Sequence, residues 1–87
     1  MTKTSLIEFP CYFPIKVMGV NSPDFLDEIT KITSNHFPDI THDAITHKPS
    51  SGANYLAITV TVFAQNQETL DAYYLEITQH PLVKMVL

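Results

Sequence analysis

Seven polar or small residues could form an anion-binding site if the fold brings them together. They are Gly19, Asn21, Ser22, Lys48, Ser50, Ser51 and His80. Ser22-Pro23-Asp24 is typical of a helix start, because serine can cap free N–H groups and proline suits the first helical position. A helix N-terminus beside a lysine and hydroxyl groups favours a carboxylate or phosphate. The same residue types are common in ordinary turns and caps, so a purely structural role is the simpler alternative.

The other reactive residues do not form a set with the spacing of a catalytic or metal site. Cys11 lies among aromatic residues and prolines, where a small packed side chain explains it. His42 and His47 are five residues apart, which places them on opposite faces of a strand with no third ligand nearby. We therefore predict no catalytic residue, no metal site and no cofactor.

Charge excludes one large class of partner. The chain of 87 residues has a net charge of −4, and its basic residues are five scattered lysines without any arginine. Nucleic acids are bound mainly by clustered cations, so we expect no nucleic-acid partner.

No apolar run approaches the length of ~18 residues that spans a bilayer, and the N-terminus lacks the apolar core of a secretory signal. We expect no membrane partner and a cytoplasmic location.

The elements that would position these residues follow from the periodicity of the apolar side chains. Alternation predicts strands at residues 12–18, 41–48, 54–63 and 82–87. Spacings of three and four predict two helices, one starting at Ser22 and ending at Phe37-Pro38, the other capped by Asn66 and ending at His80-Pro81. In the first helix Phe25, Leu26, Ile29, Ile32 and His36 form the apolar stripe. In the second, the stripe is Leu70, Tyr73, Tyr74 and Ile77.

The order βαββαβ predicts a ferredoxin-like α+β sandwich. Right-handed crossovers place both helices on one face of a four-stranded antiparallel sheet with strand order 4-1-3-2. We expect residues 1–10 to be an N-terminal tail that lays Leu6, Ile7 and Phe9 on a single domain spanning residues 11–87. In this topology the residues of the candidate anion site all lie at one end of the sheet.

The face of the sheet without helices is predicted to be rich in aromatic and aliphatic side chains. The residues expected there are Lys16, Met18, Tyr55, Ala57, Thr59, Thr61, Phe63, Lys84 and Val86. An exposed apolar patch of this kind usually marks an interface. We therefore expect a homodimer or a docking surface for another protein, the alternative being a monomer with scattered exposed apolar residues.

Four blocks of sequence resemble a known family. Glu8-Phe9-Pro10, Ile15 to Gly19, Lys48 to Gly52 with Tyr55, and Val83 to Leu87 together are similar to the YbeD-like family of small uncharacterised bacterial proteins. The resemblance implies a fold like that of the ACT regulatory domains, and for some members a link to lipoate metabolism. It implies no established activity. In ACT domains the loop after the first strand binds small effectors, and residues 19–26 resemble that loop in position.

These observations favour a non-catalytic regulatory or adaptor domain that binds a partner protein and a small anionic effector. The alternative is a small phosphate- or acyl-group-handling enzyme of acylphosphatase-like topology, although the arginine that such chemistry uses is missing. An RNA-binding domain with the same βαββαβ order is disfavoured, because Tyr55 and Phe63 are separated by threonines and the domain is acidic.

Overall fold

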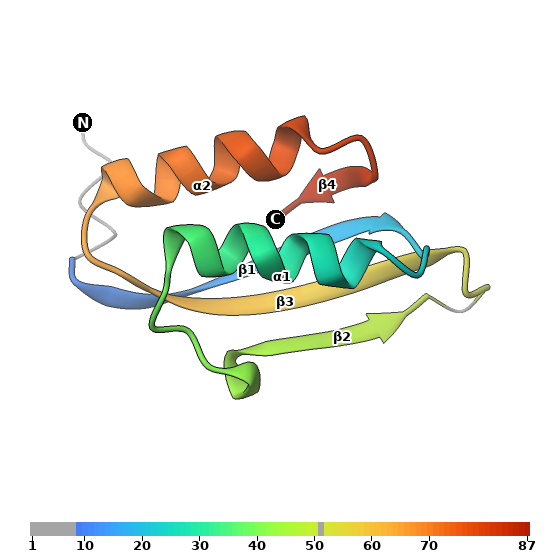
Figure 1. Ribbon diagram of the computed structural model, residues 1–87, viewed down its shortest axis with the longest axis horizontal. Coiled ribbons are helices and arrows are strands. Elements are labelled where there is room, and N and C mark those ends of the chain that lie inside the picture. Colours follow the sequence, from blue (N-terminus) through green and yellow to red (C-terminus); the bar gives the residue numbers. More distant parts are fainter. Residues whose placement is uncertain (1–8, 51) are drawn as a thin grey trace.

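The computed structural model describes residues 9–50 and 52–87 and contains the elements expected for a βαββαβ domain. In chain order they are β1 (Cys11–Val20), α1 (Phe25–His36), the 3-10 turn η2 (His42–Ala44), β2 (Ile45–Pro49), β3 (Tyr55–Ala64), α2 (Gln67–Gln79) and β4 (Val83–Val86). The strands form one sheet in the order β2-β3-β1-β4 with every neighbouring pair antiparallel. Both helices lie on the same face of this sheet (Figure 1). The predicted fold class is confirmed.

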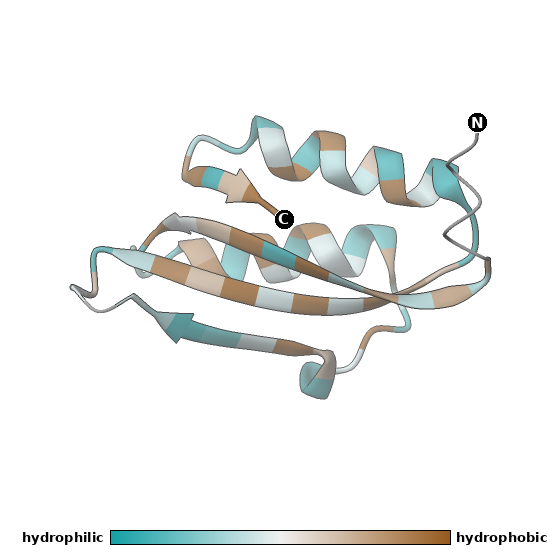
Figure 2. Cartoon of the chain, turned by 180° about the vertical axis from the view of Figure 1, so that it is seen from behind, coloured by the Kyte–Doolittle hydropathy of each residue, from teal (hydrophilic) through white to brown (hydrophobic). Residues whose placement is uncertain are grey.

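Alternation on the two central strands builds one side of the core. Among the described residues thirteen hydrophobic ones are buried, and those from β1 and β3 are Ile15, Val17, Leu56, Ile58, Val60, Val62 and Ala64. Figure 2 shows the resulting stripes of brown and pale residues along these strands. The helices cover the face that carries these buried residues with Phe25 and Ile29 from α1 and with Leu70, Tyr73 and Ile77 from α2.

Thr33 is the only polar residue buried in the described part of the chain. Its hydroxyl donates to the Ile29 carbonyl at 2.7 Å and forms a 2.6 Å hydrogen bond with the Tyr73 hydroxyl of α2. The apolar-stripe prediction for α1 missed this position, because threonine was not counted as a core residue. A buried polar pair is tolerated because each hydroxyl satisfies the other.

The two helices begin differently. At α2 the Asn66 side chain accepts a hydrogen bond from the Thr69 N–H at 2.9 Å, so the predicted cap is confirmed. At α1 the predicted serine cap is wrong, because the helix begins later, at Phe25, and no side chain caps it. Ser22 instead precedes a turn in which its carbonyl accepts from the Phe25 N–H at 3.2 Å.

The second strand is shorter than the predicted 41–48. Residues 42–44 form η2, and β2 starts only at Ile45, paired with Val60 of β3. His42 therefore lies outside the strand that was expected to hold both His42 and His47. Because β2 starts at this pair, the stretch of β3 from Thr61 to Ala64 pairs only with β1.

The last strand also departs from simple alternation. β4 pairs with β1 through Val17–Val86 and Met18–Met85, and a bulge then shifts the register so that Gly19 pairs with Val83. Val86 thus lies on the core face, and its predicted place on the open face is wrong. Met85 takes that place beside Met18. Of the residues expected in the tail, Phe9 packs against the core, and Leu6 and Ile7 lie outside the described residues.

Candidate functional site

The end of the sheet that was predicted to hold an anion is closed by hydrogen bonds between segments distant in sequence. The Val20 N–H donates to the Leu82 carbonyl at 3.0 Å. The Asn21 backbone and side chain both donate to the β2–β3 turn, at Asn54 (3.1 Å) and Ala53 (2.9 Å). The loop after β1, the β2–β3 turn and the link before β4 therefore do meet, as the topology requires.

The polar groups at this closed end are mostly engaged in holding it together. The Ser50 hydroxyl accepts from the Tyr55 N–H at 3.2 Å. His80 accepts from the Leu82 N–H at its Nδ1, so its Nε2 carries the proton and donates to the Glu28 carboxylate. The Ser22 hydroxyl oxygen is buried without a hydrogen-bond partner among the described residues. Ser51 lies outside the described residues.

Lys48, the cation of the predicted anion site, does not share a face with the start of α1. Lys48 pairs with Ala57 on β3, and both side chains belong to the face of the sheet without helices. The helix start on the other face instead has Asp24, Asp27 and Glu28 around it. The structure thus brings Gly19, Asn21, Ser22 and His80 together without the lysine, and an anionic effector at this end stays a prediction.

The open face of the sheet carries large apolar side chains in contact with solvent. Tyr12 is 73% exposed, Met85 51%, Tyr55 47% and Phe63 42%. The rings of Tyr12 and Phe63 lie 5.0 Å apart on neighbouring strands. The register places the predicted set Lys16, Met18, Tyr55, Ala57, Thr59, Thr61 and Phe63 on this face, joined by Tyr12, Thr46, Lys48 and Met85. We call these residues of the four strands the open face.

Two of the residues that the prediction for this face left out, Tyr12 and Lys48, could have been found from the sequence. Tyr12 has the same parity as Lys16 along β1, so extending the alternation by two steps would have included it. Lys48 needed only the register of the β2–β3 hairpin. Met85 could not be found this way, because the bulge reverses the parity of β4. Lys84 is the extra residue in that bulge, and its side chain is exposed.

Charge is divided between the two layers of the domain. The four strands contain three lysines and no carboxylate, whereas the two helices contain five carboxylates and one lysine. Lys16 and Lys48 belong to the open face. The sheet layer is therefore basic and the helix layer acidic in a chain whose net charge is −4.

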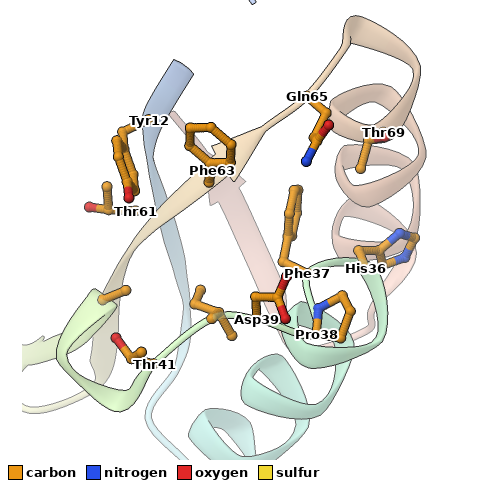
Figure 3. Close-up of a pocket in the computed structure, with 12 residues that line it drawn as sticks. Tyr12, His36, Phe37, Pro38, Asp39, Thr41, Thr61, Phe63, Gln65 and Thr69 are labelled. Atoms are coloured by element: carbon orange, nitrogen blue, oxygen red, sulfur yellow. The ribbon is translucent and has the colours of Figure 1, made fainter. Parts of the chain in front are cut away.

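A cavity of about 490 Å³ lies at the other end of the sheet, a size typical of small-ligand sites. It is bounded by the chain between α1 and η2, by the start of β1 and the end of β3, and by the start of α2. Figure 3 shows the aromatic rings of Tyr12 and Phe63 on one side and Phe37 on the other. The lining residues are Tyr12, His36, Phe37, Pro38, Asp39, Ile40, Thr41, Ala44, Thr61, Phe63, Gln65 and Thr69.

The wall behind this cavity is an aromatic cluster that joins the two helices. The ring centroids of Phe37 and Tyr73 lie 5.3 Å apart in an edge-on arrangement, and the His36 ring centroid lies 5.6 Å from that of Tyr73. His36 Nε2 is 2.7 Å from the Glu76 carboxylate of α2. Burial raises the pKa of Tyr73 to about 12, an effect that its hydrogen bond to Thr33 partly offsets. These contacts hold Phe37 in place and so fix the shape of the cavity.

No catalytic constellation is visible in the described part of the chain. His36 and His80 each contact a carboxylate, but neither is hydrogen-bonded to a Ser, Thr or Cys side chain that could act as a nucleophile. No cluster of three or more metal-ligating side chains occurs among residues 9–50 and 52–87.

Comparison with known proteins places the chain in a family. A family model described as a protein of unknown function (DUF493) matches residues 4–87. The chain belongs to this family. A UPF0250 protein of Neisseria gonorrhoeae is 51% identical over 85 residues, covering 98% of this chain and 93% of the relative. A UPF0250 protein of Leptothrix cholodnii is 47% identical over 83 residues, covering 95% and 91%. The resemblance seen in the sequence blocks is confirmed.

Solved structures support the fold at low sequence identity. The ACT domain from the GTP pyrophosphokinase of Chlorobium tepidum matches with a TM-score of 0.69 at 18% identity, covering 88% of this chain and 97% of that domain. Protein HP0495 of H. pylori matches with a TM-score of 0.65 at 19% identity, covering 93% and 85%. Membership of the DUF493 family thus comes with an ACT-like fold. None of the described helices is both long and apolar enough to cross a membrane.

Proposed function

We propose that this DUF493 protein is a non-catalytic regulatory or adaptor module that docks a partner protein on the open face of its sheet. The observation that carries the proposal is the exposure of Tyr12, Tyr55, Phe63 and Met85 on one continuous face. Aromatic residues and methionine are enriched in the cores of protein interfaces. An ACT-like fold, which the Chlorobium domain shares within a GTP pyrophosphokinase, supports a regulatory role.

Charge favours a partner with an acidic rim over a second copy of the chain. Lys16 and Lys48 belong to the open face, and no strand residue carries a carboxylate to pair with them. Face-to-face packing of two copies would bring lysines toward lysines, which costs free energy in a partly desolvated interface. An acidic partner would neutralise them. The homodimer expected from the sequence is the competing prediction, and sedimentation equilibrium tests it.

The experiment is site-specific photo-crosslinking in the native cell. A photoreactive residue replaces Thr59, which lies on β3 in the open face, or Leu75, which is 60% exposed on α2. We expect one defined acidic protein to be captured from position 59, none from position 75, and the capture to be lost when Lys16→Glu and Lys48→Glu are added. Equal capture from both positions would refute the proposal.

Sedimentation equilibrium of the purified chain separates the two kinds of partner. We expect a monomer for the wild type and for Tyr55→Glu, which places a charge on the exposed aromatic of the open face. A wild-type dimer that Tyr55→Glu dissociates would instead assign the face to a second copy. Hydrolysis of a generic acyl phosphate, lost on Lys48→Ala, would revive the enzymatic alternative.

A further inference from the structure

We propose that the cavity beside Phe37 and Phe63 binds a small organic cation, namely an ammonium group with an apolar body. The site is distinct from the predicted anion site, which lies at the opposite end of the sheet. The cavity shares Tyr12, Thr61 and Phe63 with the open face. A regulatory role for its ligand therefore rests on the proposed docking function. The binding itself does not depend on that function.

The shape of the cavity suits an apolar body. Tyr12 and Phe63 form one wall with their ring centroids 5.0 Å apart, and the buried ring of Phe37 with Pro38 forms the opposite wall (Figure 3). The Phe63 side chain, part of the first wall, remains 42% exposed. A ligand that fills the space removes this aromatic surface from water, which is the main source of affinity in small-molecule sites.

The charge of the lining residues decides whether the ligand is a cation or an anion. Asp39 carries the only fixed charge among the described residues that line the cavity, and no lysine lines it. The Asp39 carboxylate lies beside Phe37, across the hollow from Tyr12, and makes no ion pair with a described residue (Figure 3). The imidazole of His36, another lining residue, already contacts the Glu76 carboxylate at 2.7 Å.

The surroundings strengthen the same preference. Asp43 lies in η2 and Glu68 in the first turn of α2, next to the lining residues Ala44 and Thr69. Both carboxylates lie outside the lining and add a smaller, longer-range negative potential around the cavity. An ammonium group would be attracted by them and by the faces of the exposed rings, since aromatic faces favour cations. The threonine hydroxyls and Gln65 at the rim can accept its remaining hydrogen bonds.

Occupancy would alter the docking surface. The cavity opens between residues that also belong to the open face, because β2 begins only at Ile45, opposite Val60, and leaves β3 from Thr61 onward without a neighbour on that side. A ligand seated there adds a positive charge and fills the hollow next to Tyr12 and Phe63. We therefore expect it to weaken or strengthen docking at that end of the open face, as an effector does.

The test uses two probes of matched shape, 2-phenylethylammonium and 3-phenylpropionate, titrated separately into the full chain. Amide chemical shifts are followed by nitrogen–proton NMR. We expect the amine to cause saturable shifts at residues 39–41 and 61–63, with a dissociation constant on the order of 1 mM for so small a molecule. The carboxylate should cause at least fivefold weaker binding. Equal binding of both probes, or shifts confined to other residues, would overturn the proposal.

Two variants make the test specific for one carboxylate. Asp39→Asn should weaken amine binding at least fivefold and abolish the discrimination between the probes. Asp43→Asn removes a neighbouring charge outside the lining and should change the affinity less than twofold. The spectrum of each variant shows whether it is folded. If both variants weaken the amine equally, the attraction is a general one and no site exists.

The outcomes also separate this inference from the docking function. Amine binding without open-face crosslinking leaves the ligand site intact and removes its regulatory meaning. Crosslinking from position 59 without amine binding leaves the docking function and refutes the cation site. When both occur, adding the amine should change the yield of the crosslink from position 59.

Discussion

The two ends of the sheet have opposite properties. At one end the loop after β1, the β2–β3 turn and the link before β4 are tied by backbone hydrogen bonds, and Gly19 lies with no room beside it. At the other end β2 does not extend beyond Ile45 to cover the last residues of β3, and a cavity of about 490 Å³ remains between Phe37 and the Tyr12–Phe63 pair. The polar residues that suggest a site in the sequence build the closed end. The hollow end is lined mainly by residues that sequence patterns assign to structure.

The largest expected effect breaks the closed end. A Cβ atom on Gly19 would overlap both the Leu82 carbonyl oxygen and the Phe25 ring. One of these is backbone and cannot rotate away, so Gly19→Ala should lower the free energy of unfolding by about 3 kcal/mol, the upper range for overpacking. Urea denaturation followed by circular dichroism measures this change.

Gly52→Ala in the β2–β3 turn is the matched control. Its nearest neighbour would be the Asn54 side-chain nitrogen at 3.3 Å, and its φ is not positive. We expect a change within about 0.5 kcal/mol. If both substitutions cost the same, the close packing at Gly19 is not what holds this end together.

The second expected effect lies behind the hollow end and depends on pH. Burial raises the pKa of Tyr73 to about 12, above the ordinary value of 10.0 that applies in the unfolded chain. The folded state thus favours the neutral phenol, and this contribution is complete below pH ~10 and is lost as pH rises toward ~12. Stability should fall there by up to ~1.4 kcal/mol per pH unit.

Tyr73→Phe isolates this group. The variant loses the hydrogen bond to Thr33, which should cost about 1 kcal/mol at neutral pH. Above pH ~10 its stability should decline less steeply than that of the wild type, with a remainder from Tyr74, whose pKa burial also raises. Equal slopes in urea denaturation across this range would show that Tyr73 is not held neutral by the fold.

The difference between the two ends also explains what the sequence could predict. Alternation in β1 and β3 and the helical stripes record burial directly, so the fold and the open face follow from them. The end of β2 and the bulge in β4 depend on pairing between strands, which periodicity does not contain. The cavity is harder still, because its residues come from five separate segments and its walls are Phe37 and Phe63, ordinary members of apolar patterns.

The candidate anion site, which stays a prediction, illustrates the same point. Serine, glycine and lysine in a turn suggest an anion site, but hydrogen bonding inside the fold competes for the same groups. Ser50 is used by the Tyr55 N–H, and Lys48 follows the register of β2 onto the open face. In the turn itself the left-handed backbone is at Ala53, with φ of 57°, and not at the glycine beside it.

The smallest expected effect compares the starts of the two helices, one at each end of the sheet. Asn66 at the hollow end accepts from the Thr69 backbone and side chain, both at 2.9 Å, so Asn66→Ala should lower stability by about 1 kcal/mol.

Ser22 at the closed end has the residue type of a cap but caps nothing, and its hydroxyl oxygen is buried without a described partner. Ser22→Ala removes an atom whose burial without a hydrogen bond is unfavourable, so stability should stay the same or rise by up to about 1 kcal/mol. Urea denaturation of the two variants side by side gives the comparison. Equal losses would mean that Ser22 does cap α1 in solution, and the closed end would then contain the helix start that the sequence predicts.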